Sequence, residues 1–473
     1  MNSNPRTLAA ALGLLMCLWP SLGQAADLDG SQLAIWWGVP FAGVLLSIAL
    51  MPLILPAFWH HHYGKLMLAW AAAFLLPFAY SFGSGAATTG LVHALVAEYI
   101  PFIVLVGTLF VVAGGIFIRG NIHGSPGMNV LILSIGAVLA SFMGTTGASM
   151  LLIRPIIRAN DNRKHAAHVI VFFIFIVSNA GGSLTPLGDP PLFLGFLKGV
   201  DFFWTLQHIF PETLFLLASL LAIFYVIDTY YYRKAGVLPV DPTPDNTATF
   251  GFEGGVNFVF LGGVVALVLM SGLWKSGVAF SVAGADVTWA ALLRDVGLVA
   301  LALASLHLAS QQAREKNQFT WGPIVEVAKL FAAIFLTIIP VIAMLRAGTN
   351  GAFSKVVSAV TGPDGQPIDA MYFWASGALS SFLDNAPTYL VFFNTAGGDP
   401  KVLMTTLATT LAAISAGSVF MGANTYIGNA PNLMVKAIAE DRGIKMPSFF
   451  GYMAWSGAVL LPLFAIMTVI WFR

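Results

Sequence analysis

Long apolar stretches separated by short polar or charged segments recur along almost the whole chain. A helix needs about 20 predominantly apolar residues to cross a bilayer. Stretches of this kind lie near residues 33–57, 66–84, 99–118, 168–197, 207–230, 255–274, 288–310, 322–345, 402–438 and 449–471. The pattern predicts an all-α polytopic membrane protein with about 10–11 transmembrane helices.

Two further apolar stretches, 127–158 and 370–396, do not fit single spans. The first is too long for one crossing and too short for two crossings with a turn. Its centre, residues 144–147, is the helix-breaking run Gly-Thr-Thr-Gly. Arg119 precedes it, and Arg154, Arg158, Arg163 and Lys164 follow. Cations at both ends on one side of the membrane require an even number of crossings, so we expect a re-entrant hairpin, with a matching one at 370–396.

The N-terminal residues 1–26 are predicted to be either a secretory signal peptide or a first transmembrane helix. Arg6 supplies a positive start, an apolar run follows, and small residues precede Ala26 as at a cleavage site. Roughly twice as many lysines and arginines fall on one face of the predicted topology as on the other. This bias places the N-terminus in the cytoplasm before any cleavage, and the C-terminus in the periplasm.

Two sequence blocks recur 240 residues apart with no gap. Residues 141–144 (Ser-Phe-Met-Gly) match 381–384 (Ser-Phe-Leu-Asp), and 185–189 (Thr-Pro-Leu-Gly-Asp) match 425–429 (Thr-Tyr-Ile-Gly-Asn). The alternative is chance similarity between membrane segments rich in glycine and serine. Each half holds five spans and one hairpin, so the second half starts from the opposite side, as in many secondary transporters.

The repeat divides the chain into four parts. These are the signal or first helix at 1–26, a first inverted repeat at 27–231, a cytoplasmic linker at 232–253 and a second inverted repeat at 254–473. Each repeat is expected to carry one re-entrant hairpin and one broken helix. Breaks near the midplane are where transporters of this kind bind ions and substrates, because they free carbonyl groups and helix ends there.

The main candidate for ion binding is Asp384, which lies in the second hairpin just before Pro387. An intramembrane carboxylate is costly unless it is paired, protonated or bound to a cation. We expect it to hold either Na⁺ or H⁺, and capping of a half-helix is the alternative. Asp189, in a break followed by Pro190, is the second candidate, again with helix capping as the alternative.

Hydroxyl and amide side chains gather at four predicted breaks, at residues 144–147, 178–191, 384–388 and 421–432. The further candidates for ion or substrate binding are Asn179, Thr185, Thr145, Thr146, Ser381, Asn385, Thr388, Asn424, Thr425 and Asn429, and Asn432 belongs to the same polar set. Hard oxygen ligands suit Na⁺, for which we expect a site at Asp384, Asn385 and Asp189. The alternative is that some of these groups only satisfy backbone groups freed by the breaks.

Composition excludes several other classes of function. Hydrophobic residues make up 58% of the chain and charged residues 9%, which no ordinary soluble domain matches. The net charge of +1 provides no basic footprint for nucleic acid. The single cysteine excludes cysteine-based metal sites, and neither an ATP-binding run nor a motif such as HExxH or GxSxG is present. We expect no enzyme and no cofactor, with Na⁺ only as a transported or coupling ion.

These features resemble the ion transporter superfamily, in particular its citrate transporters and NhaD-type sodium/proton antiporters. Residues 178–182 (Ser-Asn-Ala-Gly-Gly), followed by Gly188-Asp189, are similar to the NhaD pattern, as is Asp384-Asn385. In that family such residues are implicated in Na⁺ binding and proton exchange. Two departures stand out: NhaD-type proteins usually carry Asp-Asn at the first hairpin, where this chain has Gly144-Thr145, and residues 422–432 look more like citrate and arsenite members.

The sequence therefore predicts a secondary active transporter of a bacterial inner membrane. The first interpretation is a Na⁺/H⁺ antiporter in which Asp384 is the exchanging carboxylate, helped by Asp189. The alternative is Na⁺- or H⁺-coupled transport of citrate or a dicarboxylate by the same fold. The expected partners are Na⁺, H⁺, the lipid bilayer and possible carboxylate substrates, but no nucleic acid; the resemblance implies a homodimer.

Overall fold

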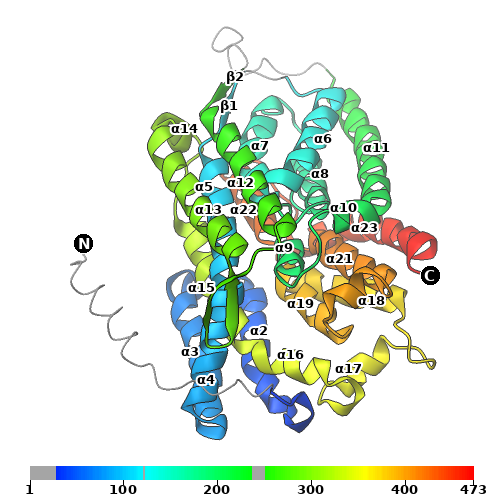
Figure 1. Cartoon of the computed structure of the whole chain (residues 1–473). Helices are drawn as coiled ribbons and strands as arrows, with labels where there is room; N and C mark the ends of the chain where they lie inside the picture. The colour runs from blue at the N-terminus through cyan, green and yellow to red at the C-terminus, as the bar shows by residue number, and fades with distance from the viewer. Residues whose placement is uncertain (1–27, 121–122, 237–250) are drawn as a thin grey trace.

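The computed structural model describes residues 28–120, 123–236 and 251–473 of the chain. The predicted signal segment at 1–26 and most of the predicted linker at 232–253 therefore lie outside the described residues. The described chain is a bundle of helices joined by short connections, with two small β-ribbons (Figure 1). It is all-α in class, as predicted.

The first half of the chain forms the following elements in order. They are η1 (Gly30–Gln32), η2 (Ile35–Gly38), α2 (Val39–Ile54), α3 (Pro56–Phe82), α4 (Ser84–His93), the π-helical η3 (Ala94–Tyr99), α5 (Ile100–Gly114), β1 (Phe117–Arg119), α6 (Pro126–Met143), α7 (Thr145–Ala159), α8 (Ala167–Ile176), η4 (Ala180–Ser183), α9 (Pro190–Leu197), α10 (Trp204–His208) and α11 (Phe210–Lys234).

The second half follows with a comparable series. It comprises β2 (Gly251–Glu253), α12 (Val256–Leu273), β3 (Val278–Val282), β4 (Ala285–Thr288), α13 (Trp289–Leu308), α14 (Gln311–Lys316), α15 (Gly322–Thr337), α16 (Ile339–Arg346), η5 (Gly348–Asn350), α17 (Ser354–Ala359), α18 (Asp369–Phe382), α19 (Asn385–Thr395), α20 (Pro400–Met404), α21 (Ala408–Phe420), η6 (Met421–Asn424), α22 (Ala430–Asp441) and α23 (Phe449–Trp471). Strands β1 and β2 pair antiparallel, as do β3 and β4.

Within the described residues, eight helical segments are long and apolar enough to cross a membrane, and a ninth is the pair α15 and α16, which is bent by 43°. This confirms a multi-pass membrane protein, but the described residues hold eight or nine candidate spans where the sequence predicted about 10–11. Two of the expected spans, 168–197 and 402–438, are not continuous helices. Each is interrupted by a 3-10 segment, η4 or η6, as the breaks at 178–191 and 421–432 predicted.

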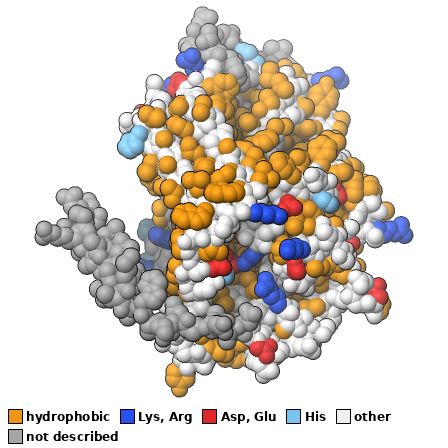
Figure 2. Space-filling view, viewed as in Figure 1, with side chains coloured by type: hydrophobic (Ala, Val, Ile, Leu, Met, Phe, Trp, Pro, Cys, Tyr) orange, Lys and Arg blue, Asp and Glu red, His pale blue; other side chains and the backbone are white. Residues whose placement is uncertain are grey.

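Two kinds of helix are distinguished by burial. Helices α8 and α21 are buried along nearly their whole length, whereas α3, α12 and α13 expose large hydrophobic side chains such as Leu68, Val259 and Leu308. Hydrophobic side chains cover much of the visible surface in Figure 2. Apolar patches of this extent are not tolerated in water. The outer helices are therefore suited to contact lipid, and the broken helices lie in the protein interior.

The two predicted hairpins begin as pairs of helices in contact. Gly144, with φ of +80°, separates α6 from α7, and the two helices pack against each other. Glycine adopts this backbone conformation without the strain that a side chain would bring. Leu383 and Asp384 separate α18 from α19, which also pack together. This arrangement supports the proposal of two re-entrant hairpins, although α6 alone is long enough for a span.

The close packing of η4 on α6 leads to a prediction about stability. A Cβ atom on Gly181 would lie 2.6 Å from the Cα atom of Ala137 and 2.7 Å from its carbonyl oxygen. We expect Gly181→Ala to destabilise the protein by about 1–3 kcal/mol through overpacking. The check is the midpoint of thermal unfolding of the purified protein in detergent.

Gly262→Ala is the matched control, because no heavy atom lies within 4 Å of the Cβ position at Gly262 in α12. Its midpoint should be unchanged or slightly higher, since alanine favours a helix. Equal midpoints for the two variants would contradict the close approach of η4 and α6.

Candidate functional site

Four half-helices begin at one place in the protein interior. Thr145 is the first residue of α7 and Asn385 the first of α19, while Asp189 and Asn429 immediately precede α9 and α22. The Asp189 carboxylate accepts hydrogen bonds from Thr145 Oγ1 at 2.9 Å, from Asn385 Nδ2, and from Asn429 Nδ2 at 3.5 Å. The second helices of both hairpins and the second broken helix thus meet at Asp189, which lies in the first broken helix.

The backbone holds this meeting point in place. The amide of Thr145 donates to the carbonyl of Gly188 at 2.9 Å, which joins the first hairpin to the first broken helix. A Cβ atom on Gly188 would lie 2.2 Å from the carbonyl oxygen of Gly182, so the segment folds back on itself where only glycine fits. Pro190 follows at once and starts α9, because a proline is well tolerated at the first helical position.

A chain of asparagines connects the two broken helices. Asn179 Nδ2 donates to Asn432 Oδ1 at 2.8 Å, and Asn429 Nδ2 approaches Asn179 Oδ1 at 3.2 Å. Asn432 Nδ2 in turn donates to the carbonyls of Gly422 and Thr425, both at 2.9 Å. Carbonyl groups freed by the second break are therefore satisfied by side chains, and the two halves of the chain are linked at their breaks.

Asp189 is deeply buried, with 1% of its surface exposed, yet no lysine or arginine in the described part of the chain bonds to its carboxylate. A buried carboxylate without compensation is costly. The compensation here comes from hydroxyl and amide donors and from the helix starts, each of which carries a partial positive charge. The arrangement is one that attracts negative charge.

The two predicted carboxylates differ in role. The side chain of Asp384 accepts from the amide of Ala386 at 3.0 Å and so caps α19, as the capping alternative anticipated. The side chain of Asp189 makes no capping bond to α9 and accepts from the first residues of α7 and α19 instead. Asp384 also interacts electrostatically with Asp189, as one negative charge with another. Asp189, the second candidate, thus lies at the centre of this hydrogen-bonded cluster.

Two buried amide oxygens of the second half have no hydrogen-bond donor within the described structure. They are Oδ1 of Asn385, whose amide nitrogen donates to Asp189, and Oδ1 of Asn424, whose amide nitrogen donates to Ser381. Buried acceptors normally find a partner. The unpaired oxygen of Asn385, which follows Asp384 in sequence and whose amide nitrogen bonds to Asp189, is a hard donor suited to a cation such as Na⁺. The described residues include no cluster of three His, Cys, Asp or Glu side chains for a metal ion.

Other predicted ligands form hydrogen bonds with backbone groups, as the alternative interpretation proposed. Thr185 Oγ1 donates to the carbonyl of Ser141, and Thr425 Oγ1 donates to the carbonyl of Ser381. The two bonds are related by the 240-residue separation of the sequence blocks, which supports the proposed repeat. Each of the two threonine hydroxyls also accepts the backbone amide two residues later, in Leu187 and in Ile427.

The remaining candidates lie at the two hairpins or in the second break. Ser381 Oγ donates to the carbonyl of Gly377 at 2.7 Å and accepts from Asn424 Nδ2 at 2.9 Å. Thr388 Oγ1 donates to the backbone carbonyl of Asp384 at 3.0 Å. Thr146 makes no side-chain hydrogen bond to the described residues and lies one position beyond Thr145. These four side chains are adjacent to the centre but do not bond to Asp189.

Asn432, which belongs to the same predicted polar set as Asn424, Thr425 and Asn429 in the break at 421–432, completes the asparagine chain. One participant lies outside the set of predicted ligands. Ser149 Oγ lies 2.8 Å from Ser178 Oγ and links α7 to the first break. The sequence feature that could have identified Ser149 is its position four residues after Thr145, which puts both side chains on one face of the helix.

The matched threonine bonds give a second prediction. Thr185→Val and Thr425→Val each leave a buried carbonyl, of Ser141 or Ser381, without its donor. We expect each variant to lower stability by about 1–3 kcal/mol, and by similar amounts. Thr146→Val is the isosteric control and should have little effect. Thermal unfolding in detergent checks this, and a large difference between Thr185→Val and Thr425→Val would contradict the equivalence of the two breaks.

The comparison with known proteins agrees with the geometry. A family model described as "Putative citrate transport" matches residues 30–472, which is nearly the whole chain. None of the curated proteins compared with the chain matches it. The family match is consistent with the predicted resemblance to the citrate members of the superfamily. The chain therefore belongs to this citrate transport family of the ion transporter superfamily, and it is a multi-pass membrane transporter, not an enzyme.

Proposed function

We propose that the protein is a secondary transporter that moves citrate or a similar small carboxylate across the membrane together with H⁺ or Na⁺. The observation that carries the proposal is the convergence of four helix starts on Asp189 without a lysine or arginine bonded to it in the described chain. Helix starts attract anions, and half-helices of discontinuous spans bind anionic substrate groups in other transporters. The family match supports a carboxylate as the substrate.

Asp189 gives a physical reason for coupling. Its carboxylate occupies the position at the helix starts that a substrate carboxylate would also favour. Two negative charges cannot share a buried site at low cost, since their repulsion is strong where water is excluded. A proton or a Na⁺ ion on Asp189 removes that repulsion. The substrate is then bound well only when the coupling cation is bound too, which is the condition for symport.

Asp384 and the unpaired oxygens of Asn385 and Asn424 provide the proposed cation ligands. Asp384 is a negative charge that interacts with Asp189, so a cation between them would be attracted by both. The hard oxygen donors suit Na⁺ better than a transition metal. The charge moved in each cycle sets the concentrating power, at about 2.3 kcal/mol per elementary charge for 100 mV of membrane potential.

Na⁺/H⁺ antiport is the second candidate, and it is favoured by the same pair of carboxylates. If Asp189 and Asp384 exchange a proton for Na⁺ in alternation, no organic substrate is required. The helix starts then serve only to stabilise the buried carboxylate of Asp189. The two functions therefore differ in one measurable respect, which is whether ion movement requires a carboxylate substrate.

The deciding experiment measures flux in proteoliposomes that contain the purified protein and a pH-sensitive dye, with radiolabelled citrate in parallel. Na⁺, Li⁺ or K⁺ is added with and without citrate. We expect citrate uptake driven by an inward Na⁺ or H⁺ gradient, and no cation-driven proton movement when citrate is absent. Proton movement on Na⁺ alone, without citrate uptake, would overturn the symport proposal in favour of antiport.

The role of Asp189 gives a third prediction. Asp189→Asn keeps the size and shape of the side chain but removes the group that must be neutralised. We expect citrate exchange across the membrane at equilibrium to stay within about tenfold of the wild type, while gradient-driven accumulation is lost. Asp399→Asn, which changes an exposed carboxylate at the start of α20, is the control and should leave both activities unchanged. Equal loss of exchange and accumulation would indicate a purely structural Asp189.

Asp384 gives a fourth prediction. Asp384→Asn retains a side chain that caps helices well, so α19 should stay folded. It removes one negative charge from the proposed cation site, and we expect the Na⁺ or H⁺ concentration for half-maximal uptake to rise at least tenfold, about 1.4 kcal/mol. The measurement is citrate uptake as a function of Na⁺ concentration at fixed pH, and as a function of pH without Na⁺. Unchanged dependence on both ions would exclude Asp384 as a ligand.

A further inference from the structure

A separate pocket with a volume of about 510 Å³ lies at one end of the bundle. Its walls come from three parts of the chain: the connection between α7 and α8, the last turns of α11, and the connection between α22 and α23. The side chains that carry charge or can carry it are Asp161, Arg163, Lys164, His165, His168, Arg442 and Lys445. None of them belongs to the site around Asp189.

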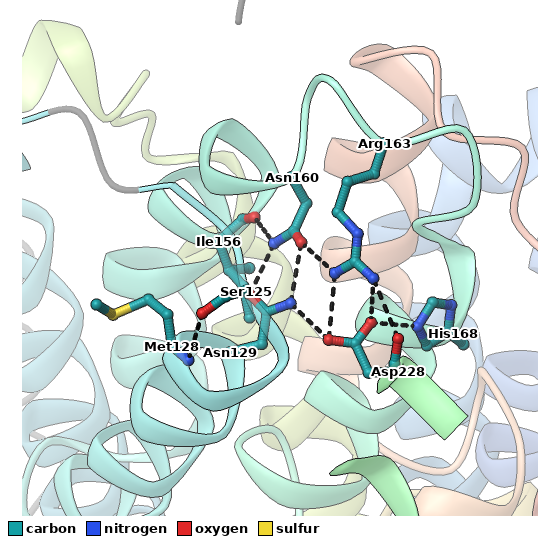
Figure 3. Close-up of polar contacts among 8 residues, drawn as sticks. All are labelled: Ser125, Met128, Asn129, Ile156, Asn160, Arg163, His168 and Asp228. Carbon is teal, nitrogen blue, oxygen red and sulfur yellow. Dashed lines mark hydrogen bonds and ion pairs between the residues drawn. The ribbon is translucent and has the colours of Figure 1, made fainter. Parts of the chain in front are cut away.

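The inner wall of the pocket is a buried ionic network centred on Asp228 (Figure 3). Arg163 donates to Asp228 through both terminal nitrogens, at 2.5 Å and 3.1 Å, and His168 Nε2 lies 2.7 Å from the same carboxylate. Asn129 Nδ2 donates to Asp228 at 3.0 Å, and Asn160 is bonded to both Asn129 and Arg163. The charge of Arg163 is thus balanced by Asp228, and hydrogen bonds connect the side chains of this wall.

The outer rim of the pocket carries an excess of positive charge. Lys164, Arg442 and Lys445 are exposed, and none of them forms an ion pair with a described residue. Arg442 is also close enough to Arg154 and Arg158 for their like charges to interact. Clustered cations repel one another, so their free energy falls when a multivalent anion binds between them. The rim therefore favours an anionic ligand.

The pocket lies where two candidate membrane spans end. Tyr231 is in the last turn of α11, and Trp455 is in the second turn of α23; both line the pocket. Tyrosine and tryptophan are typical of the membrane interface, where one end of the ring is in lipid and the other meets water. Phe450, at the start of α23, is 79% exposed. Cations next to interfacial aromatic side chains form a surface suited to a lipid head group.

We propose that this pocket binds the phosphate group of an anionic phospholipid. Lys164, Arg442 and Lys445 hold the phosphate, while the acyl chains lie along the outer surfaces of α11 and α23. The network behind Arg163 fixes the shape of the wall. A bound lipid then joins the connection after the first hairpin to the connection after the second broken helix, which are the two segments that meet in the pocket.

The test measures thermal unfolding of the delipidated, purified protein in mild detergent. Phosphatidylglycerol is titrated against phosphatidylcholine with the same acyl chains, using the wild type and the double variant Arg442→Gln/Lys445→Gln. Both substituted residues are exposed, so the fold should be retained. We expect half-maximal stabilisation of the double variant to need about 30-fold more phosphatidylglycerol, as the loss of two cations near a charged lipid implies.

Lys355→Gln/Lys401→Gln is the matched control, because it removes the same charge from exposed positions elsewhere in the chain. It should titrate like the wild type. A second arm replaces lipid with inorganic phosphate or citrate, neither of which should stabilise the protein in the millimolar range. Equal stabilisation by phosphatidylcholine, an unaltered titration of the Arg442→Gln/Lys445→Gln variant, or stabilisation by the free anions that depends on these residues would each overturn the lipid proposal.

Discussion

The position of one buried carboxylate determines how the interior of this protein is arranged. Asp189 lies where the second helix of each hairpin and the second helix of each broken span begin, and its oxygens accept hydrogen bonds from three segments far apart in sequence. A carboxylate in that place is tolerable only while all of these donors stay close. The breaks in the helices, the tight glycine contacts and the asparagine chain can all be understood as ways of keeping them there. In the proposed function the same constraint makes binding of a cation and of a carboxylate interdependent.

Much of this arrangement could be predicted from the sequence, because its signals are local. Glycine and proline in an apolar run indicate a break in the helix, so the breaks at Gly144 and around Asp189 and Asn429 could be predicted from the sequence. The separation of the two blocks by 240 residues pointed to paired structures, and the threonine bonds to Ser141 and Ser381 repeat at that separation. An acidic residue in such a break is conspicuous for the same reason.

The parts that could not be predicted depend on contacts between distant segments. Asn179 and Asn432 bond across the halves of the chain, and nothing local says which asparagine meets which. Arg163 follows the first hairpin in sequence, and its local sequence is typical of a cation at the membrane interface. Its partner Asp228 is 65 residues away and lies within a span. The prediction placed Asp384 before Asp189 on local sequence alone, whereas the hydrogen bonds that each carboxylate accepts depend on the segments that surround it. The β-ribbons were not anticipated because strands of three to five residues leave too short a pattern.

The two breaks share a backbone framework but not the same chemistry. Asp189 corresponds to Asn429, and Asp384 corresponds to Gly144, so each half contributes one carboxylate at a position where the other half has none. In the proposed inverted pair, a ligand that arrives from one side therefore meets a different order of charged and neutral groups than a ligand that arrives from the other. If the two halves are related as proposed, the scaffold is nearly symmetric while the path through it is directional. Influx and efflux through this protein should consequently have different rate-limiting steps even under equal and opposite gradients.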